Sequence, residues 1–202
     1  MKLFVRKRKP QDPCQICFLH KERCICKSIP TLRLQTKVIL VIHSKELKRT
    51  TNTGRLALEA LTNSEMRIRG KERETLDLSS LLSPAYRTLL FYPSDNAVEL
   101  NHEFIEGGKL PIQLIVPDGN WRQASKVHYR HQELQDIPRV KISTPNKAQF
   151  HLRAENTESG MSTLEAIARA LGIIEGPQVQ DELMKLYQKK LEETMKGRGV
   201  KT

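Results

Sequence analysis

The sequence lacks the features that mark several large classes of protein. No run of eighteen or more apolar residues occurs, so a membrane-spanning helix is not expected. The N-terminus turns basic before any hydrophobic signal segment forms, which predicts a soluble, cytoplasmic protein. No Gly-x-Gly-x-x-Gly opens a helix after the first expected strand, and neither Gly-Lys-Ser/Thr nor Gly-x-Ser-x-Gly occurs. A dinucleotide fingerprint, a P-loop and the usual hydrolase nucleophile elbow are therefore excluded.

Cysteine is absent after residue 26, because all four cysteines lie in one window as Cys14-x-x-Cys17 and Cys24-x-Cys26. Four thiolates suit Zn²⁺ and close a tetrahedral structural site, whereas a cytosolic compartment disfavours the alternative of disulfides. The second pair is tightly spaced and His20 lies between the halves, so His20 is an alternative ligand. The sequence predicts a small N-terminal zinc knuckle, with three nearby cations that would help offset the thiolate charge: Lys21, Arg23 and Lys27.

Size and charge set the remaining limits. A chain of 202 residues can bury one good core, with room for a small appendage. The formal net charge is +11 at pH 7, which suits a polyanionic partner. RNA, DNA and an acidic membrane surface all fit that description.

Short apolar runs alternate with helical periodicity, which predicts an α/β fold with a mostly parallel sheet. Strands are expected at residues 37–43, 88–92, 113–116 and 139–143, and helices at 54–61, 121–134, 162–171 and 179–195. Basic residues alternate from Arg67 to Arg73, and the pattern leaves that stretch unassigned.

One strand end carries an unusual combination of residues. Asp118, Gly119, Asn120 and the only tryptophan, Trp121, directly follow the apolar run 114–117. In open α/β sheets, ligands bind at the carboxyl ends of strands, so a carboxylate and an aromatic ring there are well placed to meet one. The alternative is a plain turn in which Asp118 caps the following helix.

Further polar clusters fall near other expected strand ends and would gather along one edge of a parallel sheet. They include Asn52 with Thr53, Tyr92 with Pro93, and Thr144. At the start of the expected helix 162–171, Ser162, Thr163 and Glu165 fit a capping box, but a helix N-terminus also binds anions. Arg153 is either a clamp for a carboxylate or an ordinary surface arginine.

Basic residues also follow the tryptophan. Arg122, Lys126 and Arg130 recur every four residues, which places them on one face of a helix. Contact with an RNA backbone and a solvated helix face both explain such a stripe.

Together these residues resemble the DTW-domain family of tRNA-uridine aminocarboxypropyltransferases, whose signature is Asp-x-Thr-Trp. The resemblance spans nearly the whole chain, from the cysteine cluster through Asn52-Thr53-Gly54, Tyr92-Pro93, Asp118 to Trp121 and Leu152-Arg153 to Ser162-Thr163-Leu164-Glu165-Ala166. The chain departs from the signature at Asn120, which replaces threonine and keeps hydrogen-bonding ability but loses the hydroxyl and methyl groups.

The resemblance implies a SPOUT-like catalytic domain over residues 31–202, with a knotted C-terminal region, preceded by a zinc-binding segment over residues 1–30. It also implies transfer of the 3-amino-3-carboxypropyl group of S-adenosylmethionine to N3 of a tRNA uridine, with release of methylthioadenosine. A SPOUT-like tRNA methyltransferase and a non-catalytic, zinc-containing RNA-binding module are the alternatives.

Within this interpretation, each candidate residue receives a role. Asp118 is the general base and Trp121 stacks on the uridine or faces the sulfonium. Arg153 or the helix start at Ser162 holds the methionyl carboxylate, while Glu165 pairs with its ammonium. The full donor-binding set is Tyr92, Pro93, Asp118, Gly119, Thr144, Arg153, Ser162, Thr163 and Glu165. The tRNA-binding set is Asn52, Thr53, Arg122, Lys126 and Arg130.

Overall fold

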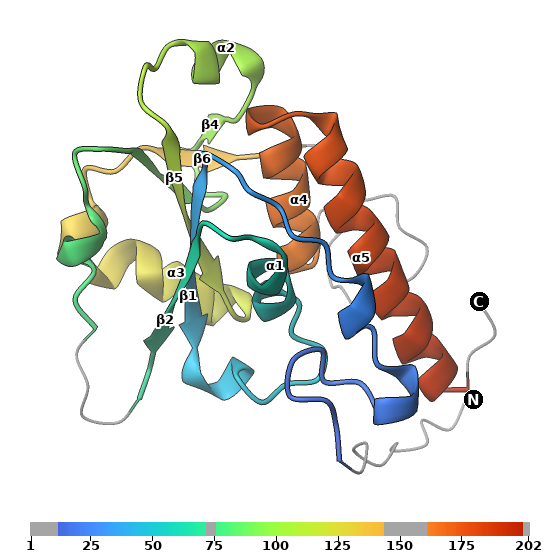
Figure 1. Ribbon diagram of the computed structural model, residues 1–202. Coiled ribbons are helices and arrows are strands. Elements are labelled where there is room, and N and C mark those ends of the chain that lie inside the picture. Colours follow the sequence, from blue (N-terminus) through green and yellow to red (C-terminus); the bar gives the residue numbers. More distant parts are fainter. Residues whose placement is uncertain (1–11, 72–75, 144–160, 200–202) are drawn as a thin grey trace.

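The computed structural model describes residues 12–71, 76–143 and 161–199. Its centre is a six-stranded sheet in the order β2-β1-β5-β3-β6-β4, in which every pair of neighbouring strands is parallel (Figure 1). The strands are β1 (Lys37–His43), β2 (Ser64–Arg69), β3 (Arg87–Phe91), β4 (Val98–Glu99), β5 (Ile112–Asp118) and β6 (Arg139–Lys141).

Helices cover both faces of this sheet. The α-helices are α1 (Gly54–Ala60), α2 (His102–Glu106), α3 (Trp121–Arg130), α4 (Thr163–Ile174) and α5 (Pro177–Gly197). Short 3-10 helices occupy Lys21–Arg23, Cys26–Ser28, Ser44–Glu46, Ser79–Leu81 and Gln132–Leu134. Figure 1 shows α1, α4 and α5 on one side of the sheet and α3 on the other.

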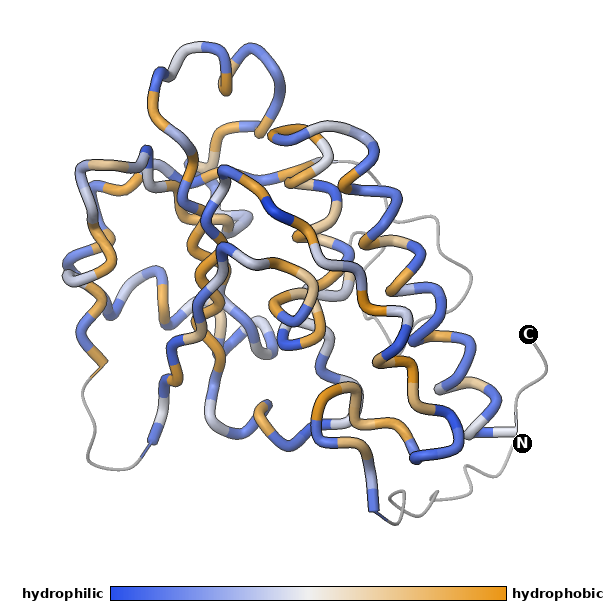
Figure 2. The backbone as a smooth tube through the Cα atoms, viewed as in Figure 1, coloured by the Kyte–Doolittle hydropathy of each residue, from blue (hydrophilic) through white to orange (hydrophobic). Residues whose placement is uncertain are grey.

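The central strands are apolar along their whole length because both of their faces are buried. In β1, Val38, Leu40 and Ile42 point into the core shared with α1, α4 and α5. Ile39 and Val41 point into a smaller core on the face that carries α3. Figure 2 shows the resulting hydrophobic colour along the inner strands.

The structure confirms the predicted α/β class and a parallel sheet, and it corrects several boundaries. The helix expected at 121–134 ends at Arg130 and is followed by a separate 3-10 turn. The strand expected at 139–143 ends at Lys141. The unassigned basic stretch contributes β2, an edge strand paired only with β1, while β4 and α2 had no expected counterpart.

The cysteine segment packs against the main core. Cys17, Leu19 and Ile25 belong to the same buried cluster as the inner residues of α4 and α5. The guanidinium of Arg55 in α1 lies 4.7 Å from the ring centroid of Phe18, which adds a cation–π contact. The division at residue 30 stays a prediction, and so does the knot, since residues 144–160 lie outside the described part of the chain. No helix among the described residues has the length and apolar character needed to cross a membrane.

Candidate functional site

The candidate site lies at the carboxyl ends of β1 and β5, where the connections that follow these two strands pass to opposite faces of the sheet. After β1 the chain enters α1, whose Leu56 and Ala57 pack on one face of the sheet. After the neighbouring strand β5 it enters α3, whose Val127 packs on the opposite face. In open α/β folds, ligands bind at the carboxyl ends of adjacent parallel strands whose connections diverge in this way.

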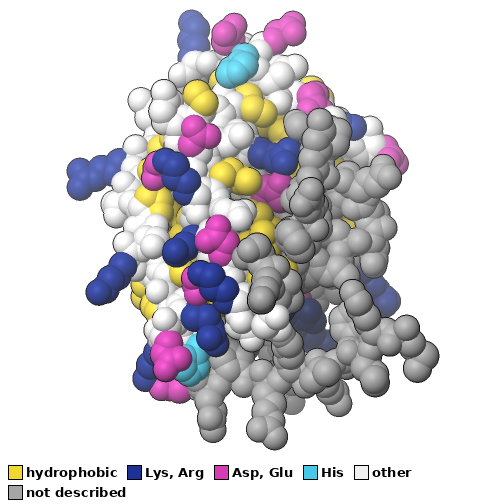
Figure 3. All heavy atoms as spheres, turned by 90° about the vertical axis from the view of Figure 1, so that its right-hand side faces the viewer, with side chains coloured by type: hydrophobic (Ala, Val, Ile, Leu, Met, Phe, Trp, Pro, Cys, Tyr) yellow, Lys and Arg dark blue, Asp and Glu magenta, His cyan; other side chains and the backbone are white. Residues whose placement is uncertain are grey.

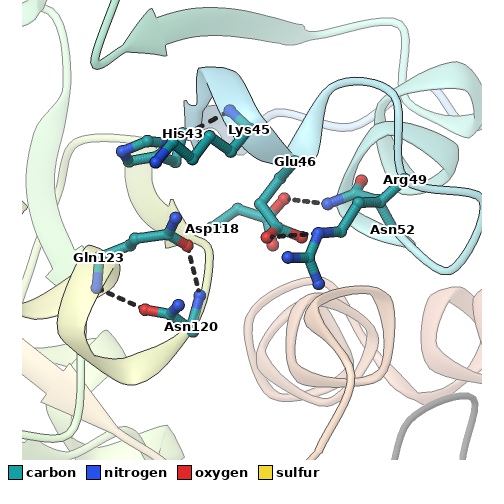
Figure 4. A network of polar contacts seen from close by, with 8 residues as sticks. All are labelled: His43, Lys45, Glu46, Arg49, Asn52, Asp118, Asn120 and Gln123. Atoms are coloured by element: carbon teal, nitrogen blue, oxygen red, sulfur yellow. Dashed lines mark hydrogen bonds and ion pairs between the residues drawn. The ribbon is translucent and has the colours of Figure 1, made fainter.

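Asp118 is the last residue of β5 and sits at this point, paired in register with Ile42 of β1. Its carboxylate accepts hydrogen bonds from Asn52 Nδ2 at 2.5 Å and from Thr163 Oγ1 at 2.5 Å. The side chain is 5% exposed, so these bonds replace the water that an ionised carboxylate requires. Figure 4 shows Asn52 meeting Asp118 from the segment after β1, next to the ion pair of Glu46 with Arg49.

Two helix starts meet at the same carboxylate. A Cβ atom built at Gly54 would lie 3.0 Å from Asp118 Oδ2, so glycine permits the first turn of α1 to approach this closely. Thr163 opens α4, and Thr53 accepts a 3.2 Å hydrogen bond from the backbone N–H of Leu164. The partial positive charge at the start of α4 therefore lies next to the Asp118 carboxylate. The motif 52–54, the end of β5 and the start of α4 thus form one contiguous structure.

The loop after Asp118 is a helix cap in which Asn120, and not Asp118, is the capping residue. Asn120 Oδ1 accepts from the backbone N–H of Gln123, and Gln123 Oε1 accepts from the backbone N–H of Asn120, each at 2.9 Å. The alternative of Asp118 as the cap is therefore wrong. Since threonine also caps helices, the departure from the Asp-x-Thr-Trp signature preserves this function.

Gly119 makes the cap possible, and replacing it tests the geometry. A Cβ atom at this position would lie 2.9 Å from Gln123 Cβ and 2.8 Å from its Oε1, closer than side chains tolerate. Gly119→Ala is expected to lower the free energy of unfolding by about 1 kcal/mol, the usual worth of a cap, measured in urea. Combined with Gln123→Ala, which removes the crowded atoms, the effect should be less than additive. Additive losses would contradict the proposed crowding.

At the start of α4 the structure favours the capping interpretation. Ser162 Oγ accepts from the backbone N–H of Glu165 at 3.2 Å. The N–H groups of Leu164 and Glu165 are thereby bonded within the protein, so an anion would find few free donors there. The Glu165 carboxylate, nearly fully buried, bonds Arg169 at 2.8 Å and does not complete a capping box.

The aromatic candidates lie in or against α3. Trp121 is the first residue of α3, three residues after the buried Asp118, and is 56% exposed. Tyr92 follows β3 and stacks on His128 of α3, with ring centroids 5.5 Å apart. Burial and the neighbouring Tyr129 raise the pKa of Tyr92, so this phenol is neutral at ordinary pH. Thr144 and Arg153 lie outside the described residues, and Pro93 directly follows Tyr92.

The predicted basic stripe on α3 is joined by residues from the neighbouring strand ends. Arg69 at the end of β2 donates to the backbone carbonyl of Gln123 at 3.3 Å, and burial followed by the charge of Arg130 lowers its pKa. His43 at the end of β1 has a pKa lowered by burial, then by Arg69 and Lys45. No ion pair between described residues includes Arg69, Arg122, Lys126 or Arg130. These four residues are referred to below as the basic face, and it was only partly predicted because β2 was unassigned.

The four cysteine sulfurs form a cluster of metal-ligand dimensions. Their Sγ atoms all lie within 4.8 Å of one another, with Cys14 and Cys26 3.4 Å apart and Cys17 and Cys24 3.8 Å apart. A tetrahedral tetrathiolate with Zn–S bonds of about 2.3 Å separates its sulfurs by about 3.8 Å. The geometry fits the predicted four-cysteine site. His20 is not part of the cluster, and its Nδ1 accepts from the backbone N–H of Glu22 at 3.4 Å.

The surroundings of the cysteine thiols shift their pKa values in different directions. Hydrogen bonding by the backbone N–H of Cys17 lowers the pKa of the Cys14 thiol to about 6. Burial raises the pKa values of Cys17 and Cys26. Because Cys17 and Cys26 resist ionisation, a cation is needed before all four sulfurs can become thiolates.

A buried lysine beside this cluster was missed by the sequence analysis. Lys190 of α5 is 1% exposed, and its ammonium donates to the backbone carbonyl of Cys17. Burial lowers the pKa of Lys190 to about 8, while the neighbouring Cys17, Cys14 and Cys26 act in the opposite direction. By contrast, Lys21 forms an ion pair with Asp12 and Arg23 lies against the end of α5, where a Cβ at Gly197 would be 3.3 Å from its Nε. The sequence signal for Lys190 was its position within the apolar stripe of a long helix.

These features define an α/β protein with two candidate sites. The candidate ligand site is the fixed carboxylate at the carboxyl edge of the parallel sheet, with the basic face beside it. The candidate metal centre is the four-cysteine cluster. The chain belongs to the DTW domain family, whose model matches residues 11–195.

Curated relatives of this chain include three proteins named tRNA-uridine aminocarboxypropyltransferase 2. The Macaca fascicularis protein is 27% identical over 188 residues, covering 90% of this chain and 62% of the relative. The Mus musculus protein is 26% identical, covering 83% and 57%. The Drosophila melanogaster protein is 26% identical, covering 87% and 72%. The chain thus spans less than two thirds of the length of the first two relatives, and no solved structure matches it.

Proposed function

We propose that this protein transfers the 3-amino-3-carboxypropyl group of S-adenosylmethionine to N3 of a uridine in tRNA. The observation that carries the proposal is the Asp118 carboxylate, held by Asn52 and Thr163 at the carboxyl edge of the sheet, with an exposed tryptophan three residues further along the chain. The names of the relatives support the choice of reaction.

Asp118 accepts the proton that uridine N3 must lose. The neutral imide is a poor nucleophile, so a positioned base is required. Asn52 and Thr163 fix the carboxylate in one orientation, which places a proton acceptor at a defined point without a further conformational search.

The nitrogen anion then attacks the methylene carbon bonded to the sulfonium sulfur. The N–C bond forms, the C–S bond breaks, and its electron pair returns to sulfur, so neutral methylthioadenosine leaves. Because two opposite charges disappear in this step, a poorly hydrated site favours the transition state over the separated ions.

The remaining candidates bind the two substrates. Trp121 offers a flat ring on which the uracil base stacks. Tyr92, Pro93, Gly119 and Thr144 surround the donor, and Arg153 clamps its carboxylate. Glu165 is already paired with Arg169, so its contact with the donor ammonium would be shared with that arginine. We assign Ser162 to capping α4, and its neighbour Thr163 to holding Asp118.

The basic face binds the phosphates of the tRNA. Arg69 and Arg130 are close enough for their positive charges to repel each other, and neither forms an ion pair with a carboxylate among the described residues. A bound anion stabilises such a pair of cations. Figure 3 shows a different face, in which cationic and acidic side chains are interspersed.

Arg130→Gln is expected to weaken binding to different tRNAs by a similar factor and to reduce the slope of log affinity against log salt by about 1. Filter binding or fluorescence anisotropy at several salt concentrations measures both quantities. The matched control is Lys189→Gln on α5, an exposed residue away from the basic face, which should leave the slope unchanged. Equal slopes for the two variants would remove Arg130 from the interface.

The cysteine cluster holds a structural zinc ion in this proposal. All four ligand positions are protein thiolates, which leaves no open position for a reacting group. The ion's contribution is therefore to fold the N-terminal segment against α1 and α5.

The reaction is tested with two isotopic forms of the donor. Purified protein is incubated with unmodified tRNA and S-adenosylmethionine labelled either in the carboxyl carbon or in the methyl group, and nucleosides are analysed by mass spectrometry. Incorporation of the carboxyl label alone supports the proposal. Incorporation of the methyl label alone would make the protein a methyltransferase. Retained tRNA binding with neither label incorporated would leave an RNA-binding module.

A further inference from the structure

The buried lysine of α5 has no carboxylate to balance it among the described residues. The Lys190 side chain ranks with the most completely buried in the structure, and its one described hydrogen bond goes to the backbone carbonyl of Cys17. An isolated ammonium at such a position is strongly destabilised by the loss of water. Its presence calls for a negative group that the folded protein supplies nearby.

The cysteine cluster is that negative group once a metal is bound. The Lys190 ammonium bonds the backbone carbonyl of Cys17, whose sulfur lies within 4.8 Å of the other three cysteine sulfurs. Four thiolates around one Zn²⁺ carry a net charge of −2, so the metal site itself needs a neighbouring cation. Lys21 is paired with Asp12 and is exposed, which makes it a weak partner for a buried charge.

We propose that Lys190 is a positioning residue of the metal site: its ammonium balances part of the tetrathiolate charge and orients the Cys17 carbonyl, so that metal binding and docking of α5 are one equilibrium. Partners that lie outside a metal's ligand shell tune the affinity of the ligands in this way. This role is independent of which group the protein transfers, because Lys190 contacts the cysteine segment.

Other contacts extend the coupling beyond Lys190. Arg23 lies beside Gly197 at the end of α5, and Cys17 packs in the same core as Leu186 and Leu191. Helix α5 packs along α4, which begins at Thr163, the donor to Asp118. Metal occupancy therefore stabilises the helix pair that carries part of the candidate catalytic site.

The test compares Lys190→Met with Lys189→Met, which removes the same charge from an exposed position on the same helix. Zinc affinity is measured by competition with a chromophoric chelator. Lys190→Met should weaken zinc binding by about 10–100-fold, the usual effect of losing such a partner, and Lys189→Met should have no measurable effect. Lys190→Gln, which keeps a donor for the carbonyl but not the charge, should behave like Lys190→Met. Equal zinc affinity in the Lys190→Met and Lys189→Met proteins would overturn the proposal.

Melting temperatures with zinc and with excess chelator separate this role from simple packing. Without metal, Lys190→Met should melt at or above the wild-type temperature because a buried charge has been replaced by an apolar group. With zinc it should melt below wild type. A residue that only packs would lower both temperatures equally, and that result would refute the coupling.

A measurement on wild-type protein covers the case in which the methionine variant does not fold. Lysines are acetylated with an amine-reactive reagent and quantified by peptide mass spectrometry, with and without chelator. Lys189 should react equally in both samples, whereas Lys190 should react only after the metal is stripped. If chelator does not change the labelling of Lys190, metal binding and the burial of Lys190 are not coupled.

Discussion

Replacing Asp118 by asparagine is expected to lower the turnover number for aminocarboxypropyl transfer by about 10²–10⁴-fold, the range that a positioned general base contributes. The substitution keeps the shape of the side chain and retains one oxygen for the Asn52 amide. It removes the negative charge that accepts the uridine proton. Turnover is measured under saturating donor and tRNA, so that a change in binding does not enter the result.

Thr163→Val is the control that distinguishes the role of the Asp118 carboxylate from the role of the hydrogen bonds that hold it. This variant removes one donor to Asp118 but leaves the carboxylate in place. It should cost about 1–3 kcal/mol of stability, because a buried acceptor loses a partner, while turnover falls much less than in Asp118→Asn. Should Asp118→Asn instead retain turnover close to that of Thr163→Val, the carboxylate would be a structural anchor only.

The convergence around Asp118 follows from parallel-strand topology and was largely predictable. The apolar runs of β1 and β5 identified both strands, and parallel strands end at one edge, which brings Asn52 to Asp118. The link from Thr163 was not predictable in the same way. It depends on the path of the chain between β6 and α4, and no local pattern specifies where α4 begins relative to the sheet.

The features that were missed share a physical cause. β2 is an edge strand whose residues are all half-buried, and only Met66 and Ile68 form its apolar face, so its period-two signal is short and charged residues dominate it, as is typical of such edges. Lysine usually faces solvent, so its residue type conceals that Lys190 lies on the buried stripe of α5. In both cases the tertiary neighbour decides the environment: β1 for the strand, and the cysteine cluster for the lysine.

Replacing Cys24 by serine is the sharpest test of whether a metal holds the N-terminal segment. Cys24 is the exposed member of the cluster, so its substitution removes a ligand without opening a cavity in the core. With free zinc at about 100 times its dissociation constant, the wild-type protein gains about 2.7 kcal/mol of stability, which the variant would lose. The melting temperature should fall by about 5–11 °C, given about 2–4 °C per kcal/mol for a chain of this size.

The decisive comparison adds excess chelator to both proteins. Wild type should then fall to the melting temperature of Cys24→Ser, and the variant should not respond to zinc or to chelator, because the two differ only in the ability to hold the ion. Cys17→Ser should melt lower still under both conditions, since that sulfur also packs in the core against α5. A wild-type protein whose melting temperature ignores chelator would show that sulfur packing and hydrogen bonds, and not a metal, join the cysteine segment to the sheet domain.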